Sequence, residues 1–184
     1  MKLYANQKST LFNIKMSDSQ TNKNSKLEQA HKTAKHFLSY RPRSEAEVRK
    51  KLNQRFPEIL VTQVLKILKK KDLINDVKFA KIWKENRDSL NPRSAHAIEK
   101  ELLDKGIDHE IAKNAVSNIN DSEAAYRASK RKSLSLNKND FPSFEQKLLG
   151  YLHRRGFNEY VSAQTVNTLW KETKNTNEIL QETY

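Results

Sequence analysis

Three prolines recur at intervals of fifty residues, and this spacing constrains the fold more than any other feature of the chain. They are Pro42, Pro92 and Pro142. The same interval links aliphatic positions after each proline: Val48 with Ile98 and Leu148, and Leu52 with Leu102 and Leu152. Self-similarity at a fixed period is typical of repeat proteins. The 184-residue chain is therefore predicted to contain three copies of one unit.

Glycines keep the same register in the last two copies. Gly106 and Gly156 are fifty residues apart, and so are the apolar pairs Ile107 and Phe157, Ile111 and Val161, and Val116 and Val166. In the first copy the matching apolar residues, Phe56, Leu60 and Leu65, come one residue early. A glycine is the preferred residue after the end of a helix. The first copy is thus predicted to lack the turn residue that ends the second helix in the other two.

Each copy is predicted to form three helices. In the first copy, apolar residues between Leu27 and Leu38 follow helical spacing. Pro42 ends that helix, because proline disfavours helical geometry in the residue before it. Ser44 and Glu47 then have the spacing of a capping box at the start of the next helix. Three glycines and four prolines leave little turn chemistry for a many-stranded β fold, so the fold class is predicted to be all-α.

The repeat defines the expected domain organisation. Residues 1–26 are predicted to be a disordered basic tail, 27–75, 76–120 and 121–172 to be three-helix repeats, and 173–184 a frayed end. Each helix offers only two or three apolar positions, so one unit alone buries little. The copies must stack, or at least touch, to be stable.

The charge balance predicts a polyanionic or acidic partner. Lys and Arg number 35 against 22 Asp and Glu, which gives a net charge of +13. With no Cys, the chain has no disulfide scaffold, thiolate zinc site or cysteine nucleophile. No apolar run approaches the ~18 residues that a membrane helix needs. We expect a cytoplasmic monomer with no membrane partner.

The sequence gives no sign of catalysis. The five histidines do not have metal-binding spacing, and no glycine-rich loop of the nucleotide-binding kind is present. We therefore predict no enzyme activity, no cofactor, and no catalytic or metal site. A metal-dependent nuclease is the alternative that spacing alone leaves open.

Basic residues recur at matching places in the units and are predicted to bind the partner. They are Arg43, Arg49, Lys50, Lys51, Arg55, Lys69, Lys70, Lys71, Arg93, Lys100, Lys105, Lys130, Arg131, Lys132, Arg154 and Arg155. A run of lysines is usually only a solvated face, but the recurrence favours a cationic stripe that follows a phosphate backbone without reading bases. Trp83 and Trp170 are predicted to be core residues. For Tyr40, which we expect to be partly exposed, packing and base stacking are equally open.

Four segments resemble the RecX family, bacterial regulators of the RecA recombinase. They are Tyr40–Leu52 (YRPRSEAEVRKKL), Leu73–Trp83 (LINDVKFAKIW), Glu101–Ile107 (ELLDKGI) and Leu152–Phe157 (LHRRGF). The first two, in this order and at this distance, are specific, and the resemblance covers about residues 27–172. The sequence departs from the family at Leu90-Asn91-Pro92, where members often carry a glycine-rich turn, and in the missing glycine after Arg55.

The resemblance implies three tandem three-helix repeats in an elongated, curved rod. It also implies binding in the groove of a filament of RecA on single-stranded DNA, with inhibition of strand exchange, ATP hydrolysis and co-protease activity. Binding to single-stranded DNA would then be non-specific and salt-dependent. Two alternatives stay open. One is a tandem helix-turn-helix-like DNA-binding protein of transcription or nucleoid architecture, and the other is an RNA-binding accessory protein.

Overall fold

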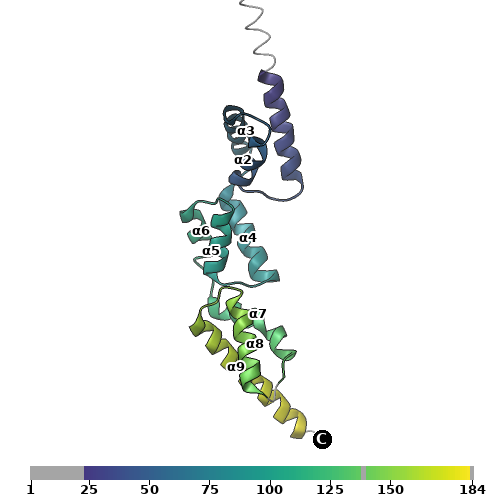
Figure 1. Cartoon of the computed structure of the whole chain (residues 1–184), viewed down its shortest axis with the longest axis vertical. Helices are drawn as coiled ribbons and strands as arrows, with labels where there is room; N and C mark the ends of the chain where they lie inside the picture. Colours follow the sequence, from purple (N-terminus) through teal and green to yellow (C-terminus); the bar gives the residue numbers. More distant parts are fainter. Residues whose placement is uncertain (1–22, 138–139, 183–184) are drawn as a thin grey trace, which may run out of the picture. The chain divides into compact units, whose positions relative to one another are not determined.

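The computed structural model describes residues 23–137 and 140–182, with side chains as far as residue 174, and every regular element in these ranges is an α-helix (Figure 1). The predicted all-α fold of three-helix repeats is confirmed. The chain divides into two compact units, Met1–Asp76 and Val77–Tyr184. Most of the predicted tail, residues 1–22, lies outside the described residues.

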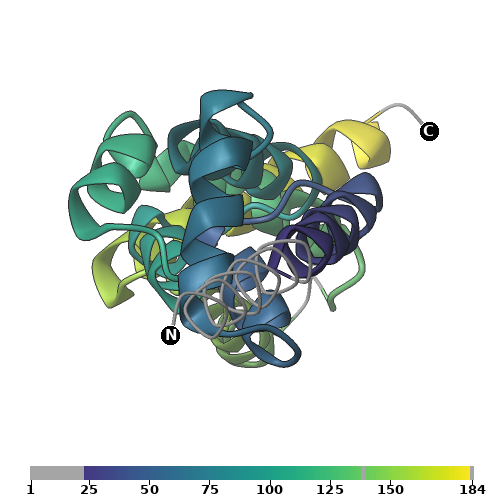
Figure 2. The ribbon, with the colours of Figure 1, turned by 90° about the horizontal axis from the view of Figure 1, so that it is seen from above.

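The first unit contains one three-helix repeat. A helix over residues 23–39 is followed by α2 (Glu45–Asn53) and α3 (Glu58–Lys70). The helix of residues 23–39, purple in Figure 2, packs with the blue helices of the same unit. Their shared core consists of Ala30, Ala34, Val48, Leu52, Val61, Val64, Leu65, Leu68 and Ile74. Alanines on the first helix let the larger side chains of α2 and α3 approach closely, which is how a small repeat reaches dense packing.

The predicted capping box starts α2. The Glu47 amide donates to Ser44 Oγ at 3.1 Å, and the Ser44 amide donates to a Glu47 carboxylate oxygen at 3.2 Å. The end of α2 lacks a glycine, as the register predicts. The Phe56 amide donates to the Leu52 carbonyl at 3.0 Å, which closes a tighter turn than in the other repeats. The early position of Phe56 in the sequence is thus a deletion of one turn residue.

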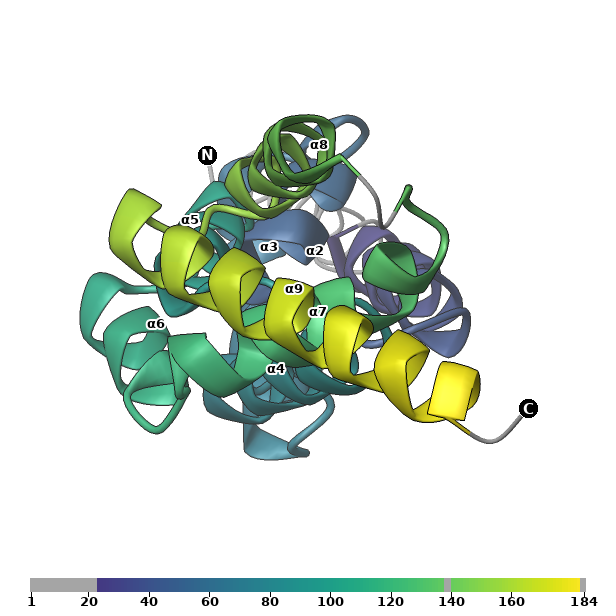
Figure 3. The ribbon, with the colours of Figure 1, turned by 90° about the horizontal axis from the view of Figure 1, so that it is seen from below.

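The second unit contains two more repeats. The first of them consists of α4 (Asp76–Leu90), whose first residue belongs to the first unit, with α5 (Ala95–Asp104) and α6 (His109–Val116). The next consists of α7 (Asp121–Leu134), α8 (Phe141–His153) and α9 (Glu159–Glu182). The long helix α9 runs across α7 in Figure 3. Each repeat has its own apolar cluster, centred on Ile98 and Leu102 in one and on Phe144, Leu148 and Leu152 in the other.

The two glycines that recur at the fifty-residue interval have the predicted role. Gly106 and Gly156 have φ angles of 74° and 84°, the left-handed conformation that ends a helix at low cost. The amides that follow close the turn. Ile107 donates to the Leu102 carbonyl at 3.1 Å and Phe157 to the Leu152 carbonyl at 3.3 Å.

The third repeat departs from the first two at the start of its second helix. Ser44 and Ser94 are buried N-cap residues, whereas the equivalent residue of the third copy, Phe144, lies within α8 and is buried in the core. The helix begins earlier because Asp140 caps it, accepting from the Ser143 amide at 3.3 Å. Pro142 then falls in the first turn, where its missing N–H is not needed.

Within the second unit the two repeats touch, as the sequence predicts. Ile119 packs against both apolar clusters. The Ala95 amide donates to Asp121 Oδ1 at 2.7 Å, and the Ser94 amide donates to the Arg155 carbonyl at 3.1 Å. The start of α5 is therefore held by residues from the next repeat.

The structure differs from the sequence-based expectation at both ends of the described chain. The first helix begins at residue 23, inside the segment 1–26 that was predicted to be disordered. Helix α9 continues to Glu182, across the segment 173–184 that was predicted to fray. Residues 171–182 contain neither Gly nor Pro, so nothing in that segment breaks the helix.

Gly156→Ala is expected to destabilise the second unit strongly. A Cβ at this position would lie 2.6 Å from Ala97 Cβ and 2.8 Å from Ser94 Oγ, in addition to the strain of a positive φ. The strain alone costs about 1–2 kcal/mol. Gly150→Ala is the matched control, because its Cβ would be 3.4 Å from the flexible end of Arg154 in a helix interior. It should stabilise by about 0.5–1 kcal/mol. Thermal denaturation followed by circular dichroism checks both, and equal effects of the two substitutions would contradict this account.

Candidate nucleic-acid interface

A groove of about 820 Å³ in the first unit gathers cationic and aromatic side chains. It lies between the helix of residues 23–39 and the end of α2, and we call it the cationic groove. Its lining consists of Gln29, Lys32, Thr33, His36, Phe37, Tyr40, Lys51, Arg55 and Phe56. Two residues of the predicted set, Lys51 and Arg55, are brought together here with Tyr40.

Helical spacing explains why these residues share the groove. On the first helix, Gln29, Lys32 or Thr33, and His36 are three or four residues apart, which places them on one face. Lys51 and Arg55 are four apart at the end of α2 and its turn. The apolar stripe of each helix faces the core, so the neighbouring faces of the two helices form the two walls.

Three aromatic residues line the groove, and the exposed one, Tyr40, is held by contacts with His36. Tyr40 is 70% exposed, and its hydroxyl is 2.9 Å from His36 Nε2. The two rings meet edge to face with centroids 5.0 Å apart. Phe37 and Phe56 are half-buried and belong to the edge of the apolar core. Tyr40 is thus exposed, as the sequence predicts, and is not a core residue.

The groove carries positive charge without an internal counter-charge. Lys32, Lys51 and Arg55 line it, and among the described residues its lining includes no Asp or Glu. Lys51 Nζ is 3.5 Å from Gln54 Oε1, a neutral partner. A concave surface with one sign of charge attracts an oppositely charged ligand more strongly than a flat one does.

Other predicted cations of the first unit are held by acidic side chains. Glu45 lies 2.8 Å from Lys69 and 3.2 Å from Arg49, and Arg49 also pairs with Glu58. The hydrogen bond from Lys69 holds the pKa of Glu45 below its usual range, and Glu45 in turn raises the pKa of Lys69. Arg49 and Lys69 are therefore partly neutralised within the repeat.

Arg43 has a structural position as well. Its guanidinium carbon lies 4.1 Å from the centroid of the Phe37 ring, and its Nη1 is 3.7 Å from Glu47. Glu47 also accepts from Arg41 at 2.7 Å. Stacking on Phe37 and pairing with the capping-box glutamate fix the loop that leads into α2.

In the second unit, several predicted cations also contact other side chains of that unit. Arg93 is 3.2 Å from Glu101, and the Arg155 guanidinium lies 3.8 Å above the Tyr151 ring and donates to Asn91 Oδ1 at 3.0 Å. Lys105 lies over Trp83, and Lys130 over Tyr126. The remaining predicted residues are exposed to solvent: Lys100, Arg131, Lys132 and Arg154 here, and Lys50, Lys70 and Lys71 in the first unit.

Both tryptophans are core-side residues, as predicted. Trp83 stacks on Phe79 with ring centroids 5.8 Å apart, and its Nε1–H donates to Glu101 at 2.8 Å. Trp170 packs against Phe141 and Phe144, with ring centroids 5.2 and 5.1 Å away. Neither ring is offered for base stacking in the way that Tyr40 is.

Three basic residues of the first repeat line depressions but were not predicted from the sequence to bind a partner. Lys32 lines the cationic groove, and Lys23 and Lys66 lie with Lys70 around a second depression of about 470 Å³ between the first helix and α3. Lys23 and Lys32 lie on the first helix, and Lys66 lies on α3. The signal was nonetheless present, since Lys32 lies three residues after Gln29 and four before His36.

The electrostatics of the first helix are those of a cation-rich region. Burial lowers the pKa of His31 from its usual value, and the nearby charges of Lys35 and Lys71 lower it further.

Across the described side chains, no group of three His, Cys, Asp or Glu is arranged to hold a metal ion. In the same part of the chain no helix is both long and apolar enough to cross a bilayer.

Comparison with known proteins gives a consistent picture. A family model described as "RecX, first three-helix domain" matches residues 30–68. "Regulatory protein RecX" of Chlorobium limicola is 32% identical over 136 residues, which cover 73% of this chain and 86% of that protein. The protein of the same name from Lactococcus lactis is 29% identical over 157 residues, or 82% of this chain and 58% of that protein. The chain thus spans about half the length of several of the curated relatives that it matches.

Two solved structures share the fold. A crystal structure of RecX from Lactobacillus salivarius matches with a TM-score of 0.63 and 23% identity, over 79% of this chain and 97% of that one. A crystal structure titled regulatory protein RecX matches with a TM-score of 0.65 and 25% identity, over 77% of this chain and 73% of the other. The first of these supports the fold alone.

The stability of the first unit is expected to depend on His31 as pH falls. The folded state disfavours protonated His31, whereas the unfolded chain binds the proton near pH 6.5. The unfolded state therefore binds more protons below that pH, and stability falls as pH drops through this range. Between pH 7.5 and 5.5, the urea concentration at the denaturation midpoint should fall less for His31→Gln than for the wild type. Lys71→Gln should give an intermediate loss, and identical losses in all three proteins would contradict the assignment.

Proposed function

The chain belongs to the RecX family, and we propose on this premise that it is a regulatory protein that binds the filament of RecA on single-stranded DNA. Its main effect is to inhibit the recombinase, ATPase and co-protease activities of the filament. The protein acts by binding and carries out no reaction of its own.

Exposed cations at equivalent positions of successive repeats support this proposal. Lys50 and Lys100 are fifty residues apart, lie on the second helices α2 and α5, and are both exposed. Neither has an acidic partner in the part of the chain that the structure describes. Linked modules that each expose a cation at the same position suit a partner that repeats its negative charge, as a filament or a phosphate backbone does.

Linked modules explain how weak contacts inhibit an enzyme. Each repeat offers few unpaired cations, so one repeat alone binds weakly. Once one repeat is bound, the next acts at a high effective concentration. Contacts to neighbouring RecA subunits then favour one state of the filament, and they oppose the subunit changes that hydrolysis and strand exchange require.

Titration of the protein into the single-stranded-DNA-dependent ATPase reaction of RecA tests the proposal. We expect strong inhibition well below one molecule per RecA subunit. The double variant Lys50→Glu, Lys100→Glu should need an about tenfold higher concentration for half-inhibition, because two exposed attractions become repulsions. Arg49 is left unchanged, since its replacement would also break its ion pairs with Glu45 and Glu58.

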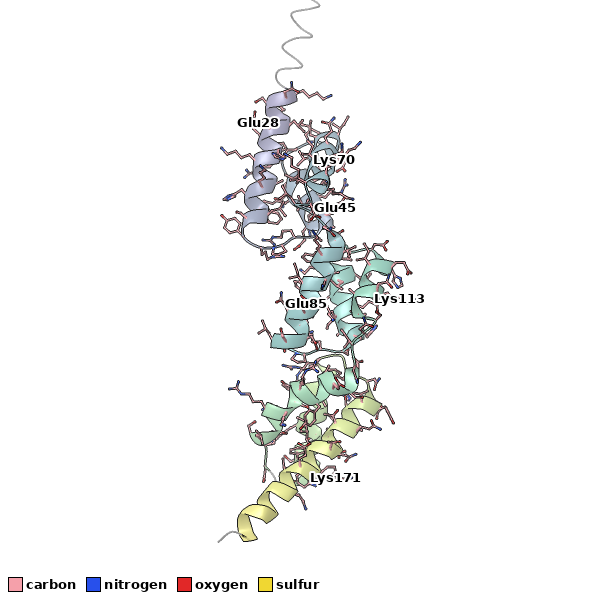
Figure 4. All side chains as sticks on the ribbon, turned by 180° about the vertical axis from the view of Figure 1, so that it is seen from behind. Glu28, Glu45, Lys70, Glu85, Lys113 and Lys171 are labelled. Carbon is pink, nitrogen blue, oxygen red and sulfur yellow. The ribbon has the colours of Figure 1, made fainter. Side chains whose placement is uncertain are left out.

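The matched control reverses two other exposed lysines, Lys113 and Lys171, which lie on α6 and α9 (Figure 4). The variant Lys113→Glu, Lys171→Glu has the same net charge and should inhibit like the wild type. No inhibition until the protein saturates the DNA would overturn the filament proposal. A large preference for one duplex sequence would favour the helix-turn-helix alternative instead.

A further inference from the structure

We propose that the cationic groove is a binding site for single-stranded nucleic acid, with a base stacked on Tyr40 and phosphates held by Lys32, Lys51 and Arg55. The choice of a DNA strand as ligand rests on the proposed function. The proposed function does not say where the strand binds. The inference places it in the first repeat, on these side chains.

Tyr40 has the properties of a stacking platform. Its ring is 70% exposed, although an aromatic side chain without a partner is usually turned toward the core. Contact with His36 through the hydroxyl and the ring edge already restricts the ring. A ring ordered before binding loses less side-chain entropy when a base stacks on it.

The charges around Tyr40 suit a phosphate chain. Lys32 on the first helix and Lys51 and Arg55 on the α2 side line both walls, with Phe37 and Phe56 between them. Aromatic rings set among cations in a groove are the arrangement that sequence-tolerant single-strand binding uses. Arg49 and Lys69 offer no such site, because Glu45 lies between them.

The dimensions favour a single strand over a duplex. The groove measures about 820 Å³, within the range of small-molecule sites, so it has room for a nucleotide-sized group. A duplex keeps the faces of its bases inside the stack, so Tyr40 cannot reach them. The Asp and Glu side chains of an acidic peptide would satisfy the cations, but they carry no ring that could stack on Tyr40.

Fluorescence anisotropy with a labelled oligo-dT strand tests the role of Tyr40 in the full chain. Tyr40→Ala should weaken binding about 5- to 150-fold, the loss of one stacked base, and should leave the salt dependence unchanged. Tyr40→Phe should lose much less affinity than Tyr40→Ala, because it keeps the ring and gives up only the hydroxyl contact with His36. Tyr160→Ala is the matched control, since Tyr160 is also 70% exposed but lies outside the cationic groove.

The salt dependence tests the cations. Lys51→Gln and Arg55→Gln should each reduce the slope of log affinity against log salt by about 0.7, the value for one phosphate contact of a single strand. Lys113→Gln, which removes the same charge from an exposed position of α6, should leave the slope unchanged.

The inference is overturned if Tyr40→Ala binds oligo-dT like the wild type, or if Tyr160→Ala weakens binding equally. It is also overturned if polyglutamate competes with the strand and its own binding depends equally on Tyr40. These measurements contain no RecA, so they are separate from the ATPase titration. Inhibition of RecA by wild type together with unchanged oligo-dT binding by Tyr40→Ala would remove the groove site and keep the proposed function. Tyr40-dependent binding of oligo-dT without inhibition of RecA would keep the groove site and remove the proposed function.

Discussion

The start of the second helix is the point on which the first two repeats depend. Ser44 and Ser94 are buried there, where free backbone amides would otherwise be costly. Each serine accepts from an amide of its own helix, and the first amide of each helix donates to an aspartate that begins the following helix bundle, at 2.9 Å to Asp76 and 2.7 Å to Asp121. The Asp76 carboxylate that accepts from the Glu45 amide is partly removed from water, and this burial raises the pKa of Asp76. One short segment therefore fixes both the helix and the chain that leads to the next helix.

This arrangement also divides the basic residues into two groups. Arg43 and Arg93 lie directly before the capping serines, and each is paired with a glutamate of the helix that follows. Their Nε atoms are buried. Farther along the same helices, Lys50 and Lys100 lie in solvent. The repeat thus uses the arginine before each second helix for its own structure and leaves the later lysine exposed to solvent.

The fold could be predicted because it depends on local features with a strict period. Proline near the start of the second helix and aliphatic residues within that helix recur every fifty residues, glycine follows the helix in the last two copies, and each feature has a local physical reason. The early start of α8 does not follow from the repeat. The position equivalent to Ser44 and Ser94 is Phe144, which cannot cap a helix, and Asp140 acts as the N-cap four residues earlier. The continuation of α9 through residue 182 was missed because low apolar content was taken to indicate fraying, although helix propensity there is unbroken.

The candidate site was less predictable, because formal charge does not reveal partners that are distant in sequence. Glu45 neutralises Lys69 from 24 residues away, and Asp88 pairs with Arg127 across 39 residues. The sequence prediction therefore grouped Lys69 with Lys51 and Arg55, although only the packing of the first helix against α2 brings the last two beside Lys32 and Tyr40.

The small cores have a consequence for binding. Each repeat buries few large side chains, so its stability is low when taken alone. A ligand that binds only the folded repeats raises their stability in proportion to the logarithm of its concentration over the dissociation constant. A polyanion that contacts several repeats therefore raises the folding stability of each of them. Binding and folding are coupled in such a chain, and substitutions at the capping serines or at Gly156 would weaken both, although none of these residues lines the cationic groove.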